Sequence, residues 1–231
     1  MPKYYPIMLD VRNRPAIVVG GNRVASDKAA SLFASGARVT VLSPEFCPEL
    51  LAQAARQEVE LLAKSYQPGD LAAAFVVVAA TDDPQLVEAI WHETQERGQL
   101  VNIVDVPARC NFIVPSILRR GQLTIAVSTE GASPSLAKRI RHQLEGTFPP
   151  AYDRYMLLAS VVRSLLRRNE ISYAQRDDFF GDFFVSNILE LLSAGDEAAA
   201  IGTTVQLLQQ HGVTTTSEIV ATDLREAQKK R

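Results

Sequence analysis

The sequence predicts an α/β fold with a parallel sheet, followed by a short mixed α/β segment and a helical C-terminal domain. Three observations support this prediction. Apolar, strand-like runs alternate with amphipathic helical patterns through the first half of the chain, which is typical of a parallel sheet covered by helices. A β-rich run and one further helix come after Pro107. From Phe148 onward, only the helical spacing of apolar residues recurs.

Glycines and prolines mark where the elements of the first half begin and end. The apolar run 15–21 stops at two glycines, as a buried strand does before a turn. Pro84 suits the first turn of a helix and Gly98 the position just past its end. We therefore expect strands in 15–21, 37–44, 75–83 and 100–107, and helices in 24–36, 48–59 and 84–98.

The second half starts with the β-rich run 122–129 and a helix that begins near Ser133. Ser133 is a good N-cap, and Pro134 fits the first helical position. We expect further helices in 152–168, 171–195 and 196–212, and a solvated basic tail rather than a functional basic patch in 225–231. The chain then divides into three parts, residues 1–113, 114–147 and 148–231.

The composition excludes several classes of function. The chain has 231 residues, 47% of them hydrophobic, and a net charge of −2, so no overall field attracts nucleic acid or an anionic membrane. No apolar stretch approaches the roughly 20 residues of a membrane span, and the N-terminus lacks a signal-peptide core. The isolated Cys47 and Cys110 fit a reducing cytoplasm. The scattered histidines argue against a preassembled metal site.

A dinucleotide-binding fingerprint, G-x-G-x-x-[GA], aligns with residues 20–25. Gly20 fits the tight turn of a Rossmann-like domain, and Ala25 fits the position of close helix–strand packing. Asn22 stands where the second glycine would let the backbone approach a pyrophosphate. Asparagine tolerates left-handed backbone angles, so we expect a usable but weaker cradle for NAD, with the Asn22 side chain turned away from the phosphates.

The fingerprint usually includes an acidic residue after the second strand, which binds the ribose hydroxyls. This part of the pattern is irregular here. The strand ends in Ser43, Pro44 and Glu45, and either Glu45 or Ser43 with backbone groups could serve. Since no basic residue stands there for a 2′-phosphate, NAD is favoured over NADP. On its own, this fingerprint is also compatible with an ordinary strand–turn–helix unit.

Six further motifs occur in order: VVGG-x-x-VA-x-x-KAA, GA-x-VTV-x-SP, VVAATDD, VNIVD, FIVPSI and LTIAVSTEGASPSLAKRIRHQLE. Together they resemble precorrin-2 dehydrogenase/sirohydrochlorin ferrochelatase, the siroheme-synthase family, closely over residues 3–145 and loosely beyond. The resemblance implies NAD-dependent oxidation of precorrin-2 to sirohydrochlorin, ferrous iron insertion in many members, and a homodimer formed through the segment from Pro115 to Leu144. Members of the family usually have a third glycine, after the two that match Gly20 and Gly21, where this chain has Asn22.

The resemblance also implies roles for individual residues. Asp105, at the end of the fourth expected strand, takes the position of the family's essential aspartate, where a carboxylate could accept protons or steer a cation; alternatively, it only caps the following turn. Coenzyme contacts are implied for Gly20, Gly21, Asn22, Arg23, Val24, Ser43, Pro44, Glu45, Thr81, Asp82 and Asn102. For Asn102 a strand-pairing role is equally compatible. The family's phosphorylatable serine falls at Thr129, with Ser128 beside it.

The implied tetrapyrrole carries eight carboxylates, so its site should be cationic. The candidate substrate-binding residues are Arg109, Arg119, Arg120, Ser128, Lys138, Arg139 and Arg141. A solvated helix face or a subunit contact is the alternative for each cation. No metal cluster in the protein is required, because the macrocycle itself supplies four nitrogens. Cys110 is expected to be a buried small residue, and the aromatic run 177–184 to be core rather than a platform for the tetrapyrrole.

Two other functions remain open from the sequence. A chelatase or tetrapyrrole-binding protein could have lost its oxidation step through Asn22. A nucleotide-sensing regulatory module would also show alternating strands and helices with a glycine turn, but it would have no use for the motifs in residues 112–145.

Overall fold

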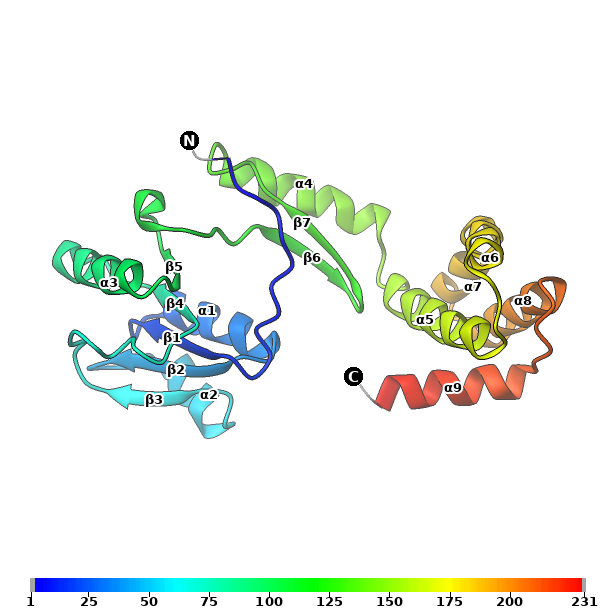
Figure 1. Cartoon of the computed structure of the whole chain (residues 1–231), viewed down its shortest axis with the longest axis horizontal. Helices are drawn as coiled ribbons and strands as arrows, with labels where there is room; N and C mark the ends of the chain where they lie inside the picture. The colour runs from blue at the N-terminus through cyan, green and yellow to red at the C-terminus, as the bar shows by residue number, and fades with distance from the viewer. Residues whose placement is uncertain (1–2, 230–231) are drawn as a thin grey trace. The chain divides into compact units, whose positions relative to one another are not determined.

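The computed structural model describes residues 3–229 and divides the chain between Val114 and Pro115 into two compact units (Figure 1). The sequence-based division at residues 113 and 147 differs from this one, since residues 115–147 and the following helices form a single unit. Within residues 3–229, none of the helices is long and apolar enough to cross a membrane.

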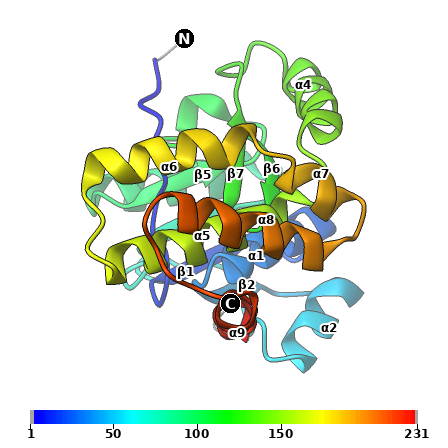
Figure 2. The same ribbon diagram turned by 90° about the vertical axis from the view of Figure 1, so that its right-hand side faces the viewer.

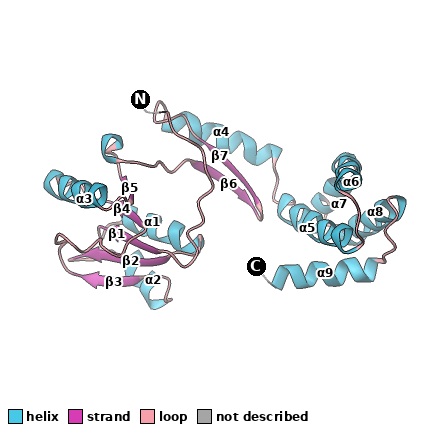
Figure 3. Ribbon diagram, in the orientation of Figure 1, coloured by secondary structure: helices cyan, strands magenta, loops and turns pink. Residues whose placement is uncertain are grey.

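The first unit contains a five-stranded sheet in the order β3-β2-β1-β4-β5, and every neighbouring pair is parallel (Figure 3). The strands are β1 Pro15–Val19, β2 Arg38–Ser43, β3 Glu60–Ala63, β4 Val76–Ala79 and β5 Leu100–Ile103. After β1 the chain adds β2 and then β3 on one side of it. It then crosses back and adds β4 and β5 on the other side of β1. The strand order therefore reverses between β1 and β4, which is the Rossmann-like arrangement predicted from the sequence.

Helices cover both faces of this sheet, as the strands' apolar residues require. They are α1 Arg23–Ala34, α2 Pro48–Ala55, α3 Pro84–Glu96 and the 3-10 turn η1 Pro107–Arg109. Ala25 and Ala29 of α1 pack with Val18 on one face. Ile90 of α3 packs with Val19 on the other. Because successive strand residues point to opposite faces, the continuous apolar runs of β1 and β4 are buried on both sides.

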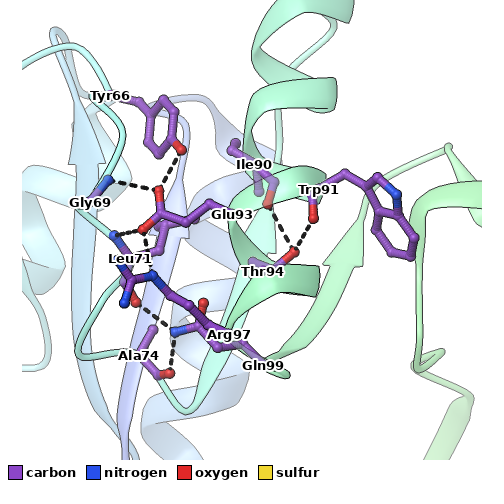
Figure 4. Close-up of polar contacts among 10 residues, drawn as sticks. All are labelled: Tyr66, Gly69, Leu71, Ala74, Ile90, Trp91, Glu93, Thr94, Arg97 and Gln99. Atoms are coloured by element: carbon purple, nitrogen blue, oxygen red, sulfur yellow. Dashed lines mark hydrogen bonds and ion pairs between the residues drawn. The ribbon is translucent and has the colours of Figure 1, made fainter.

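Glu93 on α3 forms hydrogen bonds with the segment that connects β3 and β4 (Figure 4). Its buried carboxylate accepts hydrogen bonds from Tyr66 Oη at 2.6 Å and from the backbone N–H of Gly69 at 2.9 Å. It also accepts one from Leu71 N at 3.2 Å and lies 3.3 Å from Arg97 Nε. A buried carboxylate is stable only with such partners, so this network orders a connection that has no regular structure of its own.

The second unit begins with an antiparallel hairpin, β6 Ser116–Arg120 and β7 Leu123–Val127, followed by α4 Pro134–Thr147. Gly121 in the hairpin turn has a φ of 59°, a left-handed value that favours glycine. Ser133 caps α4 as predicted, since its side chain accepts a hydrogen bond from Leu136 N. Both strands are largely half-buried within this unit.

A helical domain completes the second unit. Its helices are α5 Tyr152–Arg168, α6 Tyr173–Val185, α7 Ile188–Ser193, α8 Glu197–Gln210 and α9 Ser217–Lys229. Figure 2 shows α5 and α6 side by side, and the stacked rings of Tyr155 and Phe183, 5.1 Å apart, join them. Phe179 and Phe183 are fully buried, which confirms the core role expected for part of the aromatic run.

Four expectations about the elements need correction. The helix expected in 171–195 is divided into α6 and α7. The strand β3 was not predicted, because it has only four residues and most of them are exposed at the sheet edge. The strand β6 was also missed, since it ends in two arginines. The basic stretch 225–231 was expected to be a tail, but its residues up to Lys229 belong to α9, which Val220 and Leu224 anchor in the core; Lys230 and Arg231 lie outside the described residues.

Candidate functional site

Three predicted coenzyme-binding segments and the predicted catalytic residue lie at the carboxyl ends of parallel strands and so meet at one edge of the sheet. The segments are Gly20–Asn22 after β1, Ser43–Glu45 at the end of β2 and Thr81–Asp82 after β4, and the predicted catalytic residue Asp105 follows β5. The β1–β4 gap, where the strand order reverses, lies in the middle of this edge. Ligands of open α/β sheets bind in the crevice outside such a reversal point.

Both glycines of the turn after β1 are required by close backbone contacts. Gly20 has a φ of +130°, and a Cβ placed there would lie 2.5 Å from the carbonyl oxygen of Ala80. At Gly21, a Cβ would lie 1.7 Å from the carbonyl oxygen of Glu45. The N–H of Cys47 donates to the carbonyl of Gly21 at 2.7 Å. The turn after β1 is therefore packed directly against the segments that follow β2 and β4.

Asn22 is the N-cap of α1. Its φ of −86° is an ordinary value, so the expected advantage of asparagine in left-handed backbone is not used here. The side chain is held instead by two hydrogen bonds. Oδ1 accepts from Ala25 N at 2.9 Å, and Nδ2 donates to the Ala80 carbonyl at 3.2 Å. The amide thus occupies one of the N–H groups that a phosphate would otherwise meet at this helix end.

The start of α1 still fits an anionic group such as a pyrophosphate. The N–H groups of Arg23 and Val24 occupy the first two helical positions, where a helix provides no acceptor, and no hydrogen bond from them occurs within residues 3–229. The positive end of the helix dipole adds to their attraction for an anion. A glycine turn with two free donors is therefore compatible with a dinucleotide, and the Asn22 cap removes a third donor.

The segments after β2 and β4 flank this turn. Ser43 is 8% exposed, while Pro44 and Glu45 are exposed at the surface. Thr81 Oγ1 accepts a hydrogen bond from Asp83 N at 3.2 Å, and Asp83 in turn caps α3. Glu45 and Asp82 form no hydrogen bond or ion pair through their carboxylates within residues 3–229. Both remain available to hydroxyl groups of a ligand.

Asp105 lies in a turn two residues beyond β5, with a left-handed φ of +59°. Its side chain is exposed and forms neither a hydrogen bond nor an ion pair in the described part of the chain. The alternative role, in which Asp105 only caps the following turn, would require its carboxylate to accept a hydrogen bond from a backbone N–H. The Asp105 carboxylate is therefore a free acceptor at the sheet edge.

The loop that carries Asp105 is fixed by polar side chains at both ends. Asn102 Nδ2 donates to the Phe112 carbonyl at 3.0 Å, so this candidate coenzyme residue is engaged in holding the loop. Asn111 accepts from Val101 N at 2.8 Å and donates to the Gln99 carbonyl at 2.7 Å. Asn111 was not predicted from the sequence, because hydrogen bonds between a side chain and the backbone of a nearby strand leave no recognisable motif.

Cys110 completes this loop. Its Sγ accepts from Ile103 N at 3.2 Å and lies 3.3 Å from the carbonyls of Ile103 and Val106. Burial raises the pKa of the thiol above its ordinary value, so Cys110 stays protonated and is a poor nucleophile. The residue is half-buried rather than fully buried, and it acts as the expected packing residue.

The candidate substrate-binding cations are distributed over both units. In the first unit, Arg109 Nε donates to Glu88 at 2.9 Å, and its guanidinium lies over the Trp91 ring. In the second unit, Arg120 donates to the Phe148 carbonyl, and Arg141 pairs with Glu145. The exposed members of the group, without an ion pair within residues 3–229, are Arg119, Lys138 and Arg139.

Ser128 and Thr129 have local structural roles. Ser128 Oγ accepts from Glu130 N, and Thr129 Oγ1 accepts from Ser133 N, each at 3.0 Å. Both bonds order the connection between β7 and α4. Within residues 3–229, no group of three or more histidine, cysteine or acidic side chains could hold a metal ion.

Comparisons with known proteins agree with this geometry. Residues 7–116 match the model of an NAD(P)-binding family, and residues 120–147 match that of the sirohaem biosynthesis protein central family. The siroheme synthase of Methylobacillus flagellatus is 39% identical over 90% of this chain and 44% of its own length. The siroheme synthase of Thioalkalivibrio sulfidiphilus is 36% identical over 89% of the chain and 42% of its own length.

The chain spans less than half of the length of these siroheme synthases. The solved structure of SirC, a precorrin-2 dehydrogenase, is matched over nearly its whole length. The match covers 90% of this chain and 99% of SirC, with a TM-score of 0.73 and 27% identity. The coenzyme-type turn and the sheet order agree with this similarity to siroheme synthases and to a precorrin-2 dehydrogenase.

Proposed function

We propose that this protein oxidises precorrin-2 to sirohydrochlorin with NAD. The reaction moves a hydride from precorrin-2 to the nicotinamide and releases a proton, so that sirohydrochlorin, NADH and H⁺ are formed. The single observation that carries the proposal is the free Asp105 carboxylate on the sheet edge that also carries the glycine turn. The full-length match to SirC supports the choice of substrate.

The residues of this edge have separate tasks. A bound nicotinamide coenzyme supplies the hydride acceptor. The N–H groups of Arg23 and Val24 hold its pyrophosphate at the start of α1. Glu45, exposed after β2, accepts hydrogen bonds from the ribose hydroxyls. Asp105 accepts the proton that precorrin-2 loses, a role worth about 10²–10⁴-fold in rate.

The same edge supports NAD rather than NADP. A 2′-phosphate needs a cation after β2, whereas Glu45 would repel it. The NAD(P)-binding family as a whole does not distinguish the two coenzymes. The proposal therefore predicts a clear preference for NAD in both binding and turnover.

Tetrapyrrole carboxylates would be bound by the cationic candidates, first of all the exposed Arg119, Lys138 and Arg139. We also propose that the protein is a homodimer formed through residues 115–144 and that it works in the cytoplasm. Ferrous iron insertion into sirohydrochlorin is a second candidate activity, favoured by relatives that are named siroheme synthases. In that reaction iron is a substrate, and a free carboxylate could accept the pyrrolic protons.

An anaerobic assay tests the proposal. Purified protein is mixed with precorrin-2 and NAD, and the absorbance of sirohydrochlorin and of NADH is followed. We expect both to rise together, more slowly with NADP, and not at all without coenzyme. Ferrous iron is then added to detect siroheme. A folded protein that binds NAD but leaves precorrin-2 unchanged would overturn the dehydrogenase proposal.

A further inference from the structure

The strand β5 lies at the edge of the parallel sheet, since it ends the order β3-β2-β1-β4-β5. In a parallel strand, alternate residues direct their backbone groups to the same neighbour. The N–H of Val104, just after β5, donates inward to the carbonyl of Ala79 on β4 at 2.9 Å. The N–H groups of Val101 and Ile103 therefore face the outer edge, where a sheet leaves such groups in need of partners.

Two consecutive side chains take the place of a further strand at this edge. Val101 N donates to Asn111 Oδ1 at 2.8 Å, and Ile103 N donates to Cys110 Sγ at 3.2 Å. Asn111 N in turn donates to the Val101 carbonyl at 3.1 Å, and the Cys110 thiol lies 3.3 Å from the Ile103 carbonyl. The loop after β5 thus folds back along its own strand and satisfies the outer backbone groups.

Cys110 also holds the turn that carries Asp105. Its Sγ lies 3.3 Å from the carbonyl oxygens of both Ile103 and Val106. These residues come two positions before and one position after Asp105, and a backbone hydrogen bond of 3.2 Å joins them. A single sulfur atom therefore contacts both ends of the turn.

A protonated thiol is suited to this place because it can donate and accept at once. It accepts from Ile103 N, and its proton can be donated to the carbonyl of either Ile103 or Val106. Burial raises the pKa of the Cys110 thiol, so the proton is retained near neutral pH. A thiolate would have no proton to donate and would face two carbonyl oxygens. The protonated form is therefore the one that stabilises the turn.

The direction of the Asp105 carboxylate is set by the backbone of this turn. Asp105 has a left-handed φ of +59°, a conformation that the surrounding structure has to maintain in a residue other than glycine. The side chain is exposed, and in the described part of the chain no hydrogen bond holds its carboxylate. The contacts of Cys110 with Ile103 and Val106 are what maintains the turn from inside.

We propose that Cys110 is a positioning residue for Asp105, acting through the turn that its thiol holds. As far as turnover is concerned, the inference rests on the proposed function, in which Asp105 accepts a proton. Cys110 would act without a contact to substrate or coenzyme. Misplacement of a reacting group by about 1 Å can cost about 100-fold in rate, so a small change in this turn should appear in kcat.

Turnover of the full chain provides the first test. Cys110→Ala removes the sulfur, whereas Cys110→Ser keeps an atom that both donates and accepts. Ser35→Ala is the control, since it removes a side-chain hydrogen bond to a backbone carbonyl at the end of α1. For precorrin-2 oxidation we expect kcat to fall about 10- to 100-fold in Cys110→Ala, to recover largely in Cys110→Ser and to stay at the wild-type value in Ser35→Ala. The dissociation constant of NAD should not change in any of them.

A double variant separates positioning from a merely structural role. Once the carboxylate of Asp105 is gone, the loss of Cys110 has nothing left to misplace. Cys110→Ala/Asp105→Asn should therefore turn over at the rate of Asp105→Asn alone, whereas independent effects would multiply. Multiplied effects, or a normal kcat in Cys110→Ala, overturn the inference.

Hydrogen exchange separates this inference from the proposed function, because it needs no substrate. NMR follows the N–H groups of Val104 and Val106, which flank Asp105 and donate at 2.9 Å and 3.2 Å. We expect exchange about tenfold faster or more in Cys110→Ala, and near the wild-type rate in Cys110→Ser and Ser35→Ala. Unchanged exchange in Cys110→Ala overturns the inference even if precorrin-2 is oxidised. Faster exchange in a protein that leaves precorrin-2 unchanged supports the hold of Cys110 on the turn and rejects the proposed function.

Discussion

The side chain of Asn22 joins two neighbouring strand ends: its Nδ2 donates to the carbonyl oxygen of Ala80 at 3.2 Å. Its Oδ1 accepts from Ala25 N at the start of α1. A single amide thus ties the turn after β1 to the end of β4, at the reversal point where a coenzyme would bind. The same amide uses a donor that the coenzyme could have used.

Replacing Asn22 by glycine should strengthen NAD binding. Asn22→Gly releases Ala25 N–H to the pyrophosphate, and a hydrogen bond to a charged group contributes about 1.5–3 kcal/mol. Loss of the cap should lower the free energy of unfolding by only a few tenths of a kcal/mol, since glycine is itself tolerated at N-caps. We expect about tenfold tighter NAD binding by fluorescence titration. Unchanged or weaker binding would show that the link to Ala80 matters more than the released donor.

Gly21→Ala should be severely destabilising. The new Cβ would lie 1.7 Å from the Glu45 carbonyl, so the segment after β2 would have to move. We expect a loss of about 2–4 kcal/mol in the free energy of unfolding and no measurable NAD binding. Gly202→Ala on α8 has open space around its Cβ and serves as the control. A Gly21→Ala protein with normal stability would show that this segment moves freely.

Asp105→Asn should remove turnover without disturbing the fold. Asparagine accepts the left-handed backbone at this position but cannot take up a proton. We expect kcat for precorrin-2 oxidation to fall about 10²–10⁴-fold, with the unfolding free energy within about 0.5 kcal/mol of wild type. Asp178→Asn, at an exposed residue of α6, is the matched control. Near-normal turnover in Asp105→Asn would exclude the carboxylate from the reaction.

Glu93→Gln should destabilise the first unit. The carboxylate accepts hydrogen bonds from three donors and forms an ion pair with Arg97, and a neutral amide cannot accept from all of them. We expect a loss of about 2 kcal/mol in denaturant unfolding. Glu96→Gln, on the exposed face of the same helix, should change stability by less than about 0.5 kcal/mol. Similar effects of the two substitutions would mean that the network contributes little.

Stability should fall at alkaline pH through Tyr155. Burial raises the pKa of its phenol from 10.0 to about 12. Because the folded state holds this proton more tightly than the unfolded state, the contribution is complete below pH 10 and declines as pH rises towards about 12. Tyr155→Phe should flatten this decline in chemical unfolding of the protein, whereas Tyr173→Phe, at an exposed ring, should leave it intact. Identical pH profiles for wild type and Tyr155→Phe would contradict this cause.

The strong elements of the fold could be predicted because local and tertiary preferences agree in them. The doubly buried strands β1 and β4 are continuous apolar runs, and α3 and α4 have proline at their first positions. The edge strand β3 could not be predicted, because its hydrogen bonds to β2, rather than its composition, define it. The helix α9 was not predicted, because the charged residues on its exposed face are also typical of a solvated tail.

The candidate site was only partly predictable. Strand ends locate a coenzyme edge from the sequence, since parallel strands bring their carboxyl ends together. What each side chain does there depends on partners far along the chain: Asn22 on Ala80, Asn102 on Phe112, and Arg109 on Glu88. Such contacts have no sequence spacing, so they appear only once the chain is folded.

The left-handed backbone of Asp105 limits how this position can evolve. Glycine and asparagine also adopt such a backbone readily, but neither retains an acidic group. Glutamate retains the acid, and Glu130 and Glu170 of this chain adopt a similar backbone, but its longer side chain would carry the carboxylate to another place. Each of these substitutions therefore loses either the acid or its position at the sheet edge.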